Sequence, residues 1–180
     1  MNNILTADQI NKINIQCKNY NISNYTINSD RSIDVNGDVN LSDHLFKKIP
    51  IKFNKVNGDF NCKNGKITTL KNSPKEVSGE FNVAYNRLLS LQHCPVIVGT
   101  NFIFEENSLM DLKYFPEYIG GFYTFFGNNL ERPYYTMILE MGDKLPIFIK
   151  YMNYYEVWIG GVFNEDNYNE LKSEIEDGLL

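Results

Sequence analysis

Histidine and cysteine are the side chains with which a small enzyme most often performs nucleophilic catalysis, and this chain has few of them. The sequence contains two histidines and three cysteines. His93 directly precedes Cys94, but adjacent residues of an extended segment point to opposite sides, which is poor geometry for a nucleophile and its base. Cys62 and Cys94 both occupy positions of an internal repeat, where a buried thiol behaves as a small apolar side chain. We therefore expect structural roles for these two cysteines.

Other common catalytic and cofactor-binding patterns are also missing from the sequence. No two cysteines have the spacing of a zinc site. The glycine pairs at 120–121 and 160–161 lack the third glycine and the lysine of a phosphate-binding loop. The acidic pairs at 105–106 and 165–166 are the remaining enzymatic option, and we interpret both as solvated surface groups. The sequence thus predicts no catalytic residue, no metal and no cofactor, and a protein that is not an enzyme.

Composition and charge narrow the class of protein further. The chain has 180 residues, of which 43% are hydrophobic and 22% charged, enough apolar material for one domain with a real core. No apolar run approaches the length of a membrane span. The net charge is −5, and residues 131–180 alone carry four basic and ten acidic side chains. Without a basic stripe to neutralise phosphates, nucleic-acid binding is disfavoured.

The number of cysteines and the N-terminal residues indicate the cellular compartment of the protein. Three is an odd number of cysteines, and the first residues lack the basic start and apolar stretch of a signal peptide. We expect a soluble protein of a reducing cytoplasm that binds no membrane.

An internal period of 21 residues organises the middle of the chain. Five apolar residues recur at this spacing and are taken as offset 0 of five units: Val35, Val56, Val77, Val98 and Ile119. Offsets 4, 6, 11 and 14 are apolar in almost every unit, and offset 9 is asparagine in the last three units. Offset 18 is proline three times, at Pro74, Pro95 and Pro116. Five units without an insertion predict a repeat architecture.

The offsets predict how each unit folds. Offsets 4 and 6 alternate as a short strand does, and the asparagine at offset 9 is typical of a turn whose side chain satisfies backbone groups. The chain then turns back, so that the side chains at offsets 11 and 14 point into the same interior as those at offsets 4 and 6. Since one unit cannot bury its apolar edge alone, stacked units must form a continuous core, which predicts a solenoid. His44 and Gly65 replace the asparagine in the first two units, where we expect less regular turns.

The segment Phe81-Asn82-Val83-Ala84-Tyr85-Asn86-Arg87-Leu88-Leu89-Ser90-Leu91 resembles the leucine-rich-repeat signature L-x-L-x-x-N-x-L-x-x-L. Residues 32–41 and 56–62 are similar to segments of short leucine-rich-repeat-like proteins encoded by tailed bacteriophages. The resemblance covers roughly residues 25–130. It implies a curved solenoid that binds other proteins, with 3₁₀ helix or extended chain on its convex side.

The sequence outside the repeats predicts two caps within one structural domain. Residues 1–34 form the N-terminal cap, a helix over 6–20 with Ile10, Ile13 and Cys17 on its inner stripe, followed by a hairpin. The repeat array takes residues 35–130. Residues 131–180 form a C-terminal helical cap, with helices over 133–158 and a last acidic helix over 164–177. The predicted fold class is therefore an α/β solenoid, a leucine-rich-repeat-like array of five units with short parallel strands.

The outward strand positions, at offsets 3, 5 and 7, are the candidate binding surface on the concave side. This surface is acidic and rich in asparagine in the first units and apolar in the last. Its apolar part includes Phe122 and Phe126. Exposed aromatic side chains are costly unless something covers them, so either the C-terminal cap folds over these two residues or they anchor a partner. The predicted partner-binding residues are Asp59, Asn61, Glu80, Asn82, Tyr85, Glu105, Phe122 and Phe126.

These observations predict a non-enzymatic protein-binding module. The resemblance implies a phage protein that acts in the host cytoplasm on a host protein, such as a defence or regulatory factor. The acidic surface predicts a partner with a basic patch. The alternative is a structural or assembly protein that self-associates or attaches to a virion component, and the oligomeric state stays open.

Overall fold

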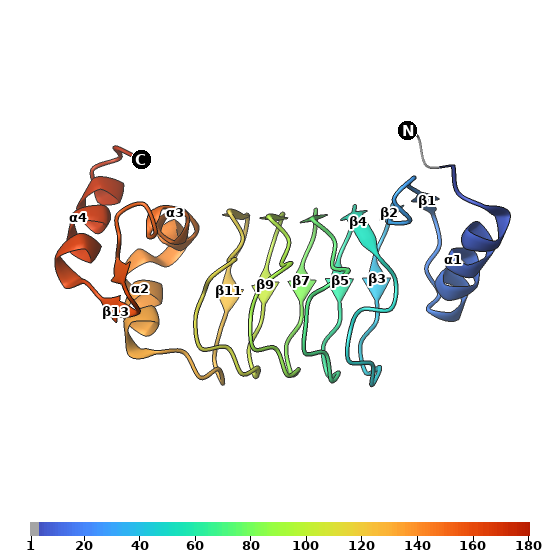
Figure 1. Cartoon of the computed structure of the whole chain (residues 1–180), viewed down its shortest axis with the longest axis horizontal. Coiled ribbons are helices and arrows are strands. Elements are labelled where there is room, and N and C mark those ends of the chain that lie inside the picture. The colour runs from blue at the N-terminus through green and yellow to red at the C-terminus, as the bar shows by residue number, and fades with distance from the viewer. Residues whose placement is uncertain (1–3) are drawn as a thin grey trace.

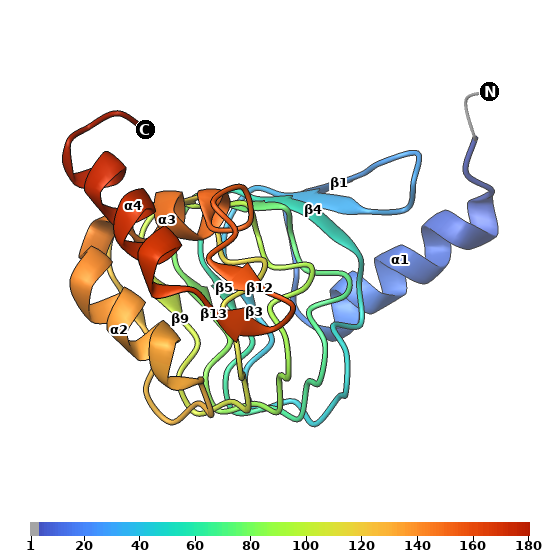
Figure 2. The same ribbon diagram turned by 60° about the vertical axis from the view of Figure 1, so that its left-hand side comes forward.

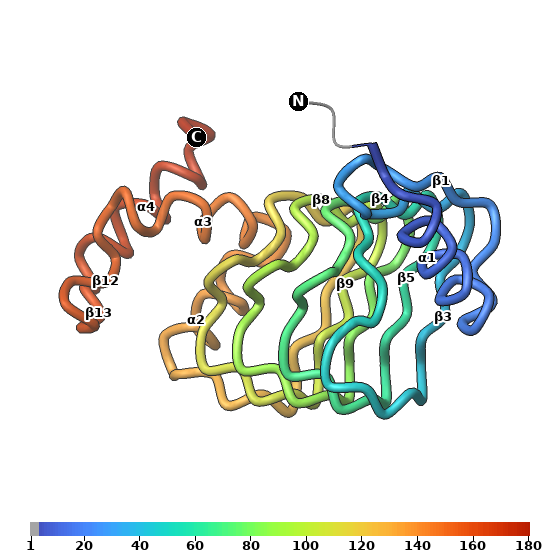
Figure 3. The backbone as a smooth tube through the Cα atoms, turned by 45° about the vertical axis from the view of Figure 1, so that its right-hand side comes forward, coloured from blue at the N-terminus to red at the C-terminus, as the bar shows by residue number. Residues whose placement is uncertain are grey.

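The computed structural model describes residues 4–180, so the first three residues of the predicted N-terminal cap lie outside the described residues. The repeats form an elongated array of coils, with one helix at its N-terminal end and several at its C-terminal end (Figure 1). The tube through the backbone shows the coils stacked one behind another with the same outline (Figure 3). The predicted solenoid between two caps is therefore confirmed.

Two sheets of short strands run along the array. In the described part of the chain, the first sheet has β1 (Tyr25–Ile27) paired antiparallel with β2 (Ile33–Val35), and then parallel strands in chain order. These parallel strands are β4 (Phe53–Val56), β6 (Glu76–Val77), β8 (Ile97–Val98) and β10 (Tyr118–Ile119). The second sheet is parallel throughout and consists of β3 (Val39–Asn40), β5 (Phe60–Asn61), β7 (Phe81–Asn82), β9 (Phe102–Ile103) and β11 (Tyr123–Thr124).

The register of the strands follows the 21-residue period. Phe60 pairs with Phe81, and Phe81 with Phe102, so each residue lies beside its counterpart in the next coil. Apart from the hairpin arm at 33–35, the sequence predicted one strand in each unit, whereas the later coils have a second one that ends at offset 0. A bend at offsets 1 and 2 separates the two strands, and some of the glycines in this bend lie against the backbone of the preceding coil. A Cβ atom on Gly58 would lie 2.6 Å from the carbonyl carbon of Gly37.

The predicted interior positions form one core. Offsets 4, 6, 11 and 14 are buried throughout the second, third and fourth units, as expected. The rings of Phe60, Phe81 and Phe102 are completely buried and follow one another at centroid distances of 5.6 and 5.7 Å. The prolines at offset 18 are also buried. The return side of the second to fourth coils consists of turns, bends and extended chain, with an isolated bridge between Lys48 and Thr69.

The N-terminal cap has the predicted helix and hairpin. α1 (Ala7–Asn19) begins at Thr6, whose hydroxyl accepts a hydrogen bond from the amide of Gln9, while the Gln9 side chain accepts one from the amide of Thr6. Ile13 and Cys17 are buried, but the expectation for Ile10 is wrong, because this residue is 38% exposed. Figure 2 shows the reason: α1 projects away from the array, so its first turns lie too far out to pack against the core.

The C-terminal cap closes the other end of the core. Its elements are α2 (Arg132–Met141), the 3₁₀ helix η1 (Gly142–Lys144), α3 (Leu145–Tyr151), β12 (Trp158–Ile159), β13 (Val162–Phe163) and α4 (Glu165–Glu176). The prediction of helices as far as residue 158 is wrong at its end, where β12 and β13 form an antiparallel hairpin. Gly160 and Gly161 take positive φ angles of 58° and 84°, which a two-residue hairpin turn requires. The predicted last helix is confirmed.

No helix in the described part of the chain combines the length and the apolar character needed to cross a membrane.

Candidate interaction surface

The candidate site is the outer surface of the second sheet, which we call the strand face and define by the residues at offsets 3, 5 and 7. The residues at these offsets are exposed or half-buried except Ala84, which is 2% exposed, while offsets 4 and 6 point into the core. All eight predicted partner-binding residues lie on the strand face or at its edge. Asp59 and Phe122 precede strands that are three strand spacings apart, about 14 Å.

Offset 3 is acidic in the first three units, and two of these side chains, Asp38 and Asp59, also have a structural role. Oδ1 of Asp38 accepts a hydrogen bond from the amide of Asp59 at 2.8 Å, and Oδ1 of Asp59 accepts one from the amide of Glu80 at 2.7 Å. The same contact recurs between Asn101 and the amide of Phe122 at 3.3 Å. Each of these side chains therefore binds its coil to the next one. A substitution at Asp59 would disturb this link as well as the surface charge.

The side chains of the asparagines at offset 5 also make hydrogen bonds with the backbone. Oδ1 of Asn61 accepts a hydrogen bond from the amide of Lys63 at 3.0 Å, and Oδ1 of Asn82 accepts one from the amide of Ala84 at 3.2 Å. The carboxylate of Glu80 accepts hydrogen bonds from the side chains of Asn82 and Asn101, at 3.2 and 3.3 Å. The half-buried Asn61, Glu80 and Asn82 thus form an ordered polar part of the strand face.

The apolar end of the strand face is open to solvent. Phe122 is 58% exposed and Phe126 is 66% exposed, so the C-terminal cap does not cover them. Tyr123, between them, turns inward, and its hydroxyl donates to the carbonyl oxygen of Gly142 at 2.8 Å. Burial and the nearby Asp143 raise the pKa of Tyr123 to about 12, which keeps this hydroxyl a donor. β11 is therefore bound to the cap through Tyr123, while Phe122 and Phe126, which flank this strand in the sequence, stay exposed to solvent.

The last two predicted residues lie at the edge of the strand face, where the chain leaves the strands. Tyr85 is 52% exposed and has a φ angle of 55°. Offset 8 has a positive φ in every unit, so the direction of the Tyr85 side chain is fixed by the coil itself. Glu105 is half-buried, and its carboxylate makes no hydrogen bond or ion pair among residues 4–180. Half-buried Ile103 and Thr124 were not among the predicted residues; they pair with each other at offset 5, so that Thr124 lies between Phe122 and Phe126 along its coil.

Two of the cysteines and one of the histidines have the following surroundings. Burial raises the pKa values of the Cys62 and Cys94 thiols, which favours their neutral form. His44 packs at the N-terminal end of the array, with its ring 5.3 Å from that of Tyr20. Within residues 4–180, no three histidine, cysteine, aspartate or glutamate side chains converge as metal ligands would.

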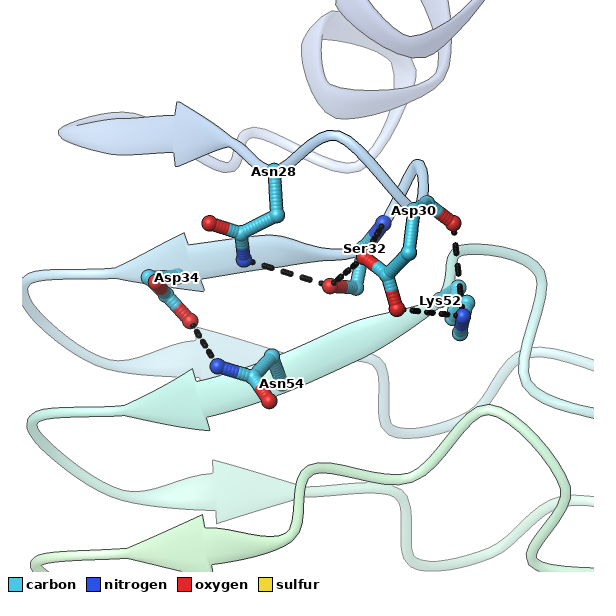
Figure 4. Close-up of polar contacts among 6 residues, drawn as sticks. All are labelled: Asn28, Asp30, Ser32, Asp34, Lys52 and Asn54. Atoms are coloured by element: carbon cyan, nitrogen blue, oxygen red, sulfur yellow. Dashed lines mark hydrogen bonds and ion pairs between the residues drawn. The ribbon is translucent and has the colours of Figure 1, made fainter. Parts of the chain in front are cut away.

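A polar cluster at the other end of the array joins the hairpin to the first coils (Figure 4). Oδ1 of Asp30 accepts hydrogen bonds from the amide and the hydroxyl of Ser32, at 3.1 and 2.6 Å, and Oδ2 accepts one from Nζ of Lys52 at 2.7 Å. The hydrogen bond from Lys52 is the main reason that the pKa of Asp30 lies well below its usual range. Asn54 donates to Asp34 in the same way, at 2.7 Å. These contacts hold the hairpin turn against β4 and complete a structural cluster.

The fold and the strand face together define a parallel β-solenoid with 21-residue coils, capped by helices, with an exposed aromatic pair at one end of its second sheet. No protein-family model, no curated protein and no solved structure matches the chain.

Proposed function

We propose that this protein is a non-enzymatic binding module that holds a protein partner on its strand face. The observation that carries the proposal is the exposure of Phe122 and Phe126 on the outward rows of a sheet whose other side is completely packed. Large aromatic side chains dominate the energetics of protein interfaces, and an exposed pair on a monomer has a cost that a partner would remove.

The surroundings of the two phenylalanines suit a protein partner. Half-buried Ile103 pairs with Thr124 of β11, while Glu105 follows β9 and Glu80 precedes β7, the next strand along the sheet. An apolar centre beside a polar rim is the usual anatomy of an interface. Because β9 is hydrogen-bonded to a strand on each side and β11 is hydrogen-bonded to β9, little backbone conformational entropy is lost on binding. The acidic rim favours a partner that carries a basic patch next to an apolar spot.

The origin of the protein and its partner are proposed from the sequence resemblance alone. Similarity to leucine-rich-repeat-like proteins of tailed bacteriophages suggests a phage protein that binds a bacterial host protein in the cytoplasm, such as a defence or regulatory factor. The solenoid fold is compatible with this proposal, since stacked repeats present extended binding surfaces.

The test is affinity capture from a bacterial lysate with three forms of the protein. The forms are the wild type, the double variant Phe122→Ser with Phe126→Ser, and the control Tyr154→Ser, whose side chain on the C-terminal cap is 83% exposed. A protein captured by the wild type and the control, but lost with the double variant, supports the proposal. Capture that survives the double variant and fails with Tyr154→Ser places the binding surface on the cap.

A charge variant tests the role of the acidic rim. Glu105→Lys is more suitable than reversal at Asp59, because the Asp59 carboxylate holds the amide of Glu80 in the next coil. We expect Glu105→Lys to slow association with the captured partner, and the difference from the wild type to shrink at high salt. An unchanged association rate at low salt would argue against a basic partner surface.

Self-association is a second candidate function, favoured by the aromatic surface of the cap. Tyr151, Tyr154 and Tyr155 line a hollow of about 510 Å³ together with Lys150 and Leu180. A second copy or a virion component could cover it. Size-exclusion chromatography with light scattering distinguishes the two functions, since an oligomer that Tyr154→Ser dissociates would favour assembly, whereas a monomer favours the binding module.

A further inference from the structure

The chain that returns from the strand face to the first sheet carries an unusual charge in the first three units. We call this surface the return face and define it by offsets 10 to 19 of these units, which are residues 45–54, 66–75 and 87–96. It has no acidic side chain and seven basic ones, all exposed: Lys47, Lys48, Lys52, Lys66, Lys71, Lys75 and Arg87. The whole array, residues 35–130, has ten basic and nine acidic side chains, so its total charge hides this concentration.

The fold brings these basic side chains together from three separate segments of the sequence. The coils stack with the same outline (Figure 3), so residues at equal offsets in adjacent coils lie about 4.8 Å apart. Lys66 and Arg87 are such a pair, at offset 10 of adjacent units. Lys52, Lys71 and Lys75 line one hollow of the surface. The return face is therefore one continuous basic surface.

Most of these charges are not compensated within the protein. Lys52 is paired with Asp30 at 2.7 Å, whereas the other six basic side chains make no ion pair with any described residue. The same segment of the fourth unit, residues 108–117, has two acidic side chains and one lysine, Lys113, which lies 3.8 Å from Asp111. Like charges at short distances repel one another, and a polyanion that binds them releases its own counterions.

Hydroxyl groups between the lysines are oriented by the backbone. The hydroxyl oxygens of Thr69 and Ser90, both at offset 13, accept hydrogen bonds from the amides of Lys71 and Gln92, at 3.2 and 3.1 Å. Neither hydroxyl donates a hydrogen bond to a described residue, so each proton is free for an acceptor outside the chain. Lysine, arginine and hydroxyl side chains are those that most often contact the phosphates of nucleic acids.

We propose that the return face binds the phosphate backbone of double-stranded DNA without sequence preference. A duplex offers one negative charge for about every 1.7 Å of its axis, which suits a dense group of uncompensated cations. The return face contains no helix that could enter the major groove and read bases. It also exposes no phenylalanine, tyrosine or tryptophan on which the bases of a single strand could stack.

The net acidic charge of the protein does not oppose this binding. Residues 131–180 carry four basic and ten acidic side chains, and they form the C-terminal cap at the other end of the array (Figure 1). Salt screens charges that are separated by more than about 10 Å, so the cap has little influence on a duplex at the first coils. This surface is separate from the strand face, and the inference goes beyond the proposed protein-binding function.

The test is fluorescence anisotropy with a labelled mixed-sequence duplex of about 20 base pairs, at salt concentrations from about 50 to 200 mM. For about five phosphate contacts, we expect the logarithm of the affinity to fall with the logarithm of the salt concentration with a slope near −4.5. The double variant Lys71→Gln with Lys75→Gln should reduce the size of this slope by about 2 and weaken binding at low salt at least about tenfold.

Two double variants serve as controls and should bind the duplex like the wild type. Lys113→Gln with Lys150→Gln removes the same charge from lysines that lie beside Asp111 and Glu117, outside the return face. Phe122→Ser with Phe126→Ser changes the strand face alone, so failure of this proposal is distinguishable from failure of the protein-binding function. Equal losses in the two lysine double variants, or no binding at low salt, would overturn the proposal.

The remaining outcomes identify a different occupant of the return face and would also overturn the proposal. Tighter binding of a single strand of the same length would indicate a single-strand site. Tighter binding of vesicles that contain phosphatidylserine would indicate a membrane surface. An oligomer of the protein alone at low salt, dissociated by Lys71→Gln with Lys75→Gln, would indicate the acidic cap of a second copy, and light scattering measures it.

Discussion

Three buried asparagines, at offset 9, satisfy the backbone where successive coils turn. The amide of Asn107 donates to the carbonyl oxygens of Phe104 in its own coil and Val83 in the preceding one, at 3.1 and 3.0 Å. Its Oδ1 accepts from the amide of Leu88 at 3.0 Å. Asn86 and Asn128 repeat this pattern. Each hydrogen bond contributes about 1 kcal/mol net, and more would be lost if a buried backbone group stayed unpaired.

The sequence predicted the turn role of these asparagines but not their contacts between coils. A single sequence gives the spacing of side chains, whereas the rise from one coil to the next decides which carbonyl oxygens they reach. The departure at Gly65 has a local reason, because a Cβ atom there would lie 2.7 Å from Oδ1 of Asn86. The exposure of Phe122 and Phe126 could not be predicted either, since it depends on how the C-terminal cap lies.

At the level of single residues, we expect Phe81→Ala to lower the free energy of unfolding by about 3–5 kcal/mol. The ring is completely buried between those of Phe60 and Phe102, and the stacked coils leave little freedom to fill a cavity. Chemical denaturation followed by circular dichroism measures the change. Leu89→Ala is the control, because Leu89 is 68% exposed and should change stability by less than about 0.5 kcal/mol. A Phe81→Ala variant as stable as the wild type would contradict the assigned register.

The ends of the helices and strands were predictable where a local signal marks them. The reciprocal hydrogen bonds of Thr6 and Gln9 begin α1 at the residue that the sequence indicates. The strand at 33–35 was predicted as part of the hairpin, but β6, β8 and β10 were missed, because two residues are too few to show an alternating pattern. Such a short segment becomes a strand only by pairing with the adjacent coils. The β12–β13 hairpin was missed because the aromatic residues before it continue an apolar run that is typical of helices.

At the level of elements, Glu140 joins α2 to α4 and should make the cap sensitive to acid. Oε2 of Glu140 accepts hydrogen bonds from the hydroxyl of Tyr168 and from Nζ of Lys172, both at 2.7 Å. The contact with Lys172 is the main cause that lowers the pKa of Glu140. The folded state therefore favours the carboxylate, and its contribution is present above the unfolded pKa, about 4.3, and is lost as the pH falls through the folded pKa.

We expect Glu140→Gln to be less stable than the wild type at pH 7, by up to about 1 kcal/mol because the ion pair is partly exposed. The difference should shrink as the pH falls below about 4.3, because the carboxylate of the unfolded chain and then that of the folded protein take up protons. Urea denaturation at pH 7 and at pH 3 measures it, and Glu170→Gln on α4, the helix that carries Lys172, is the control, since Glu170 forms no ion pair with a described residue. If Glu140→Gln were less stable than the wild type by the same amount at pH 3 as at pH 7, the stabilisation would come from the packing and hydrogen-bond geometry of Glu140 and not from its charge.

On the scale of the whole molecule, the core runs without interruption from α1 to α4. Ile13 and Cys17 at one end and Leu171 and Ile175 at the other belong to the same cluster of buried side chains. The period predicted this continuity for the coils, because each one needs its neighbours to bury its apolar edge. The caps join the cluster through their own apolar faces, so neither end has a separate core.

The continuous core predicts that the caps and the coils unfold together. Trp158 is the single tryptophan of the chain and lies in the C-terminal cap, with its ring stacked on that of Tyr134 at a centroid distance of 5.3 Å. Its fluorescence therefore reports the cap, whereas far-ultraviolet circular dichroism reports all the helices and strands. We expect the two signals to give the same urea midpoint in the wild type, and Phe81→Ala to lower both midpoints equally although Phe81 lies in the array. The fluorescence midpoint could instead stay at the wild-type value while the circular dichroism midpoint fell. The cap would then be a separate folding unit, because a destabilised third coil would not destabilise α2 and the rest of the cap through the two coils between them.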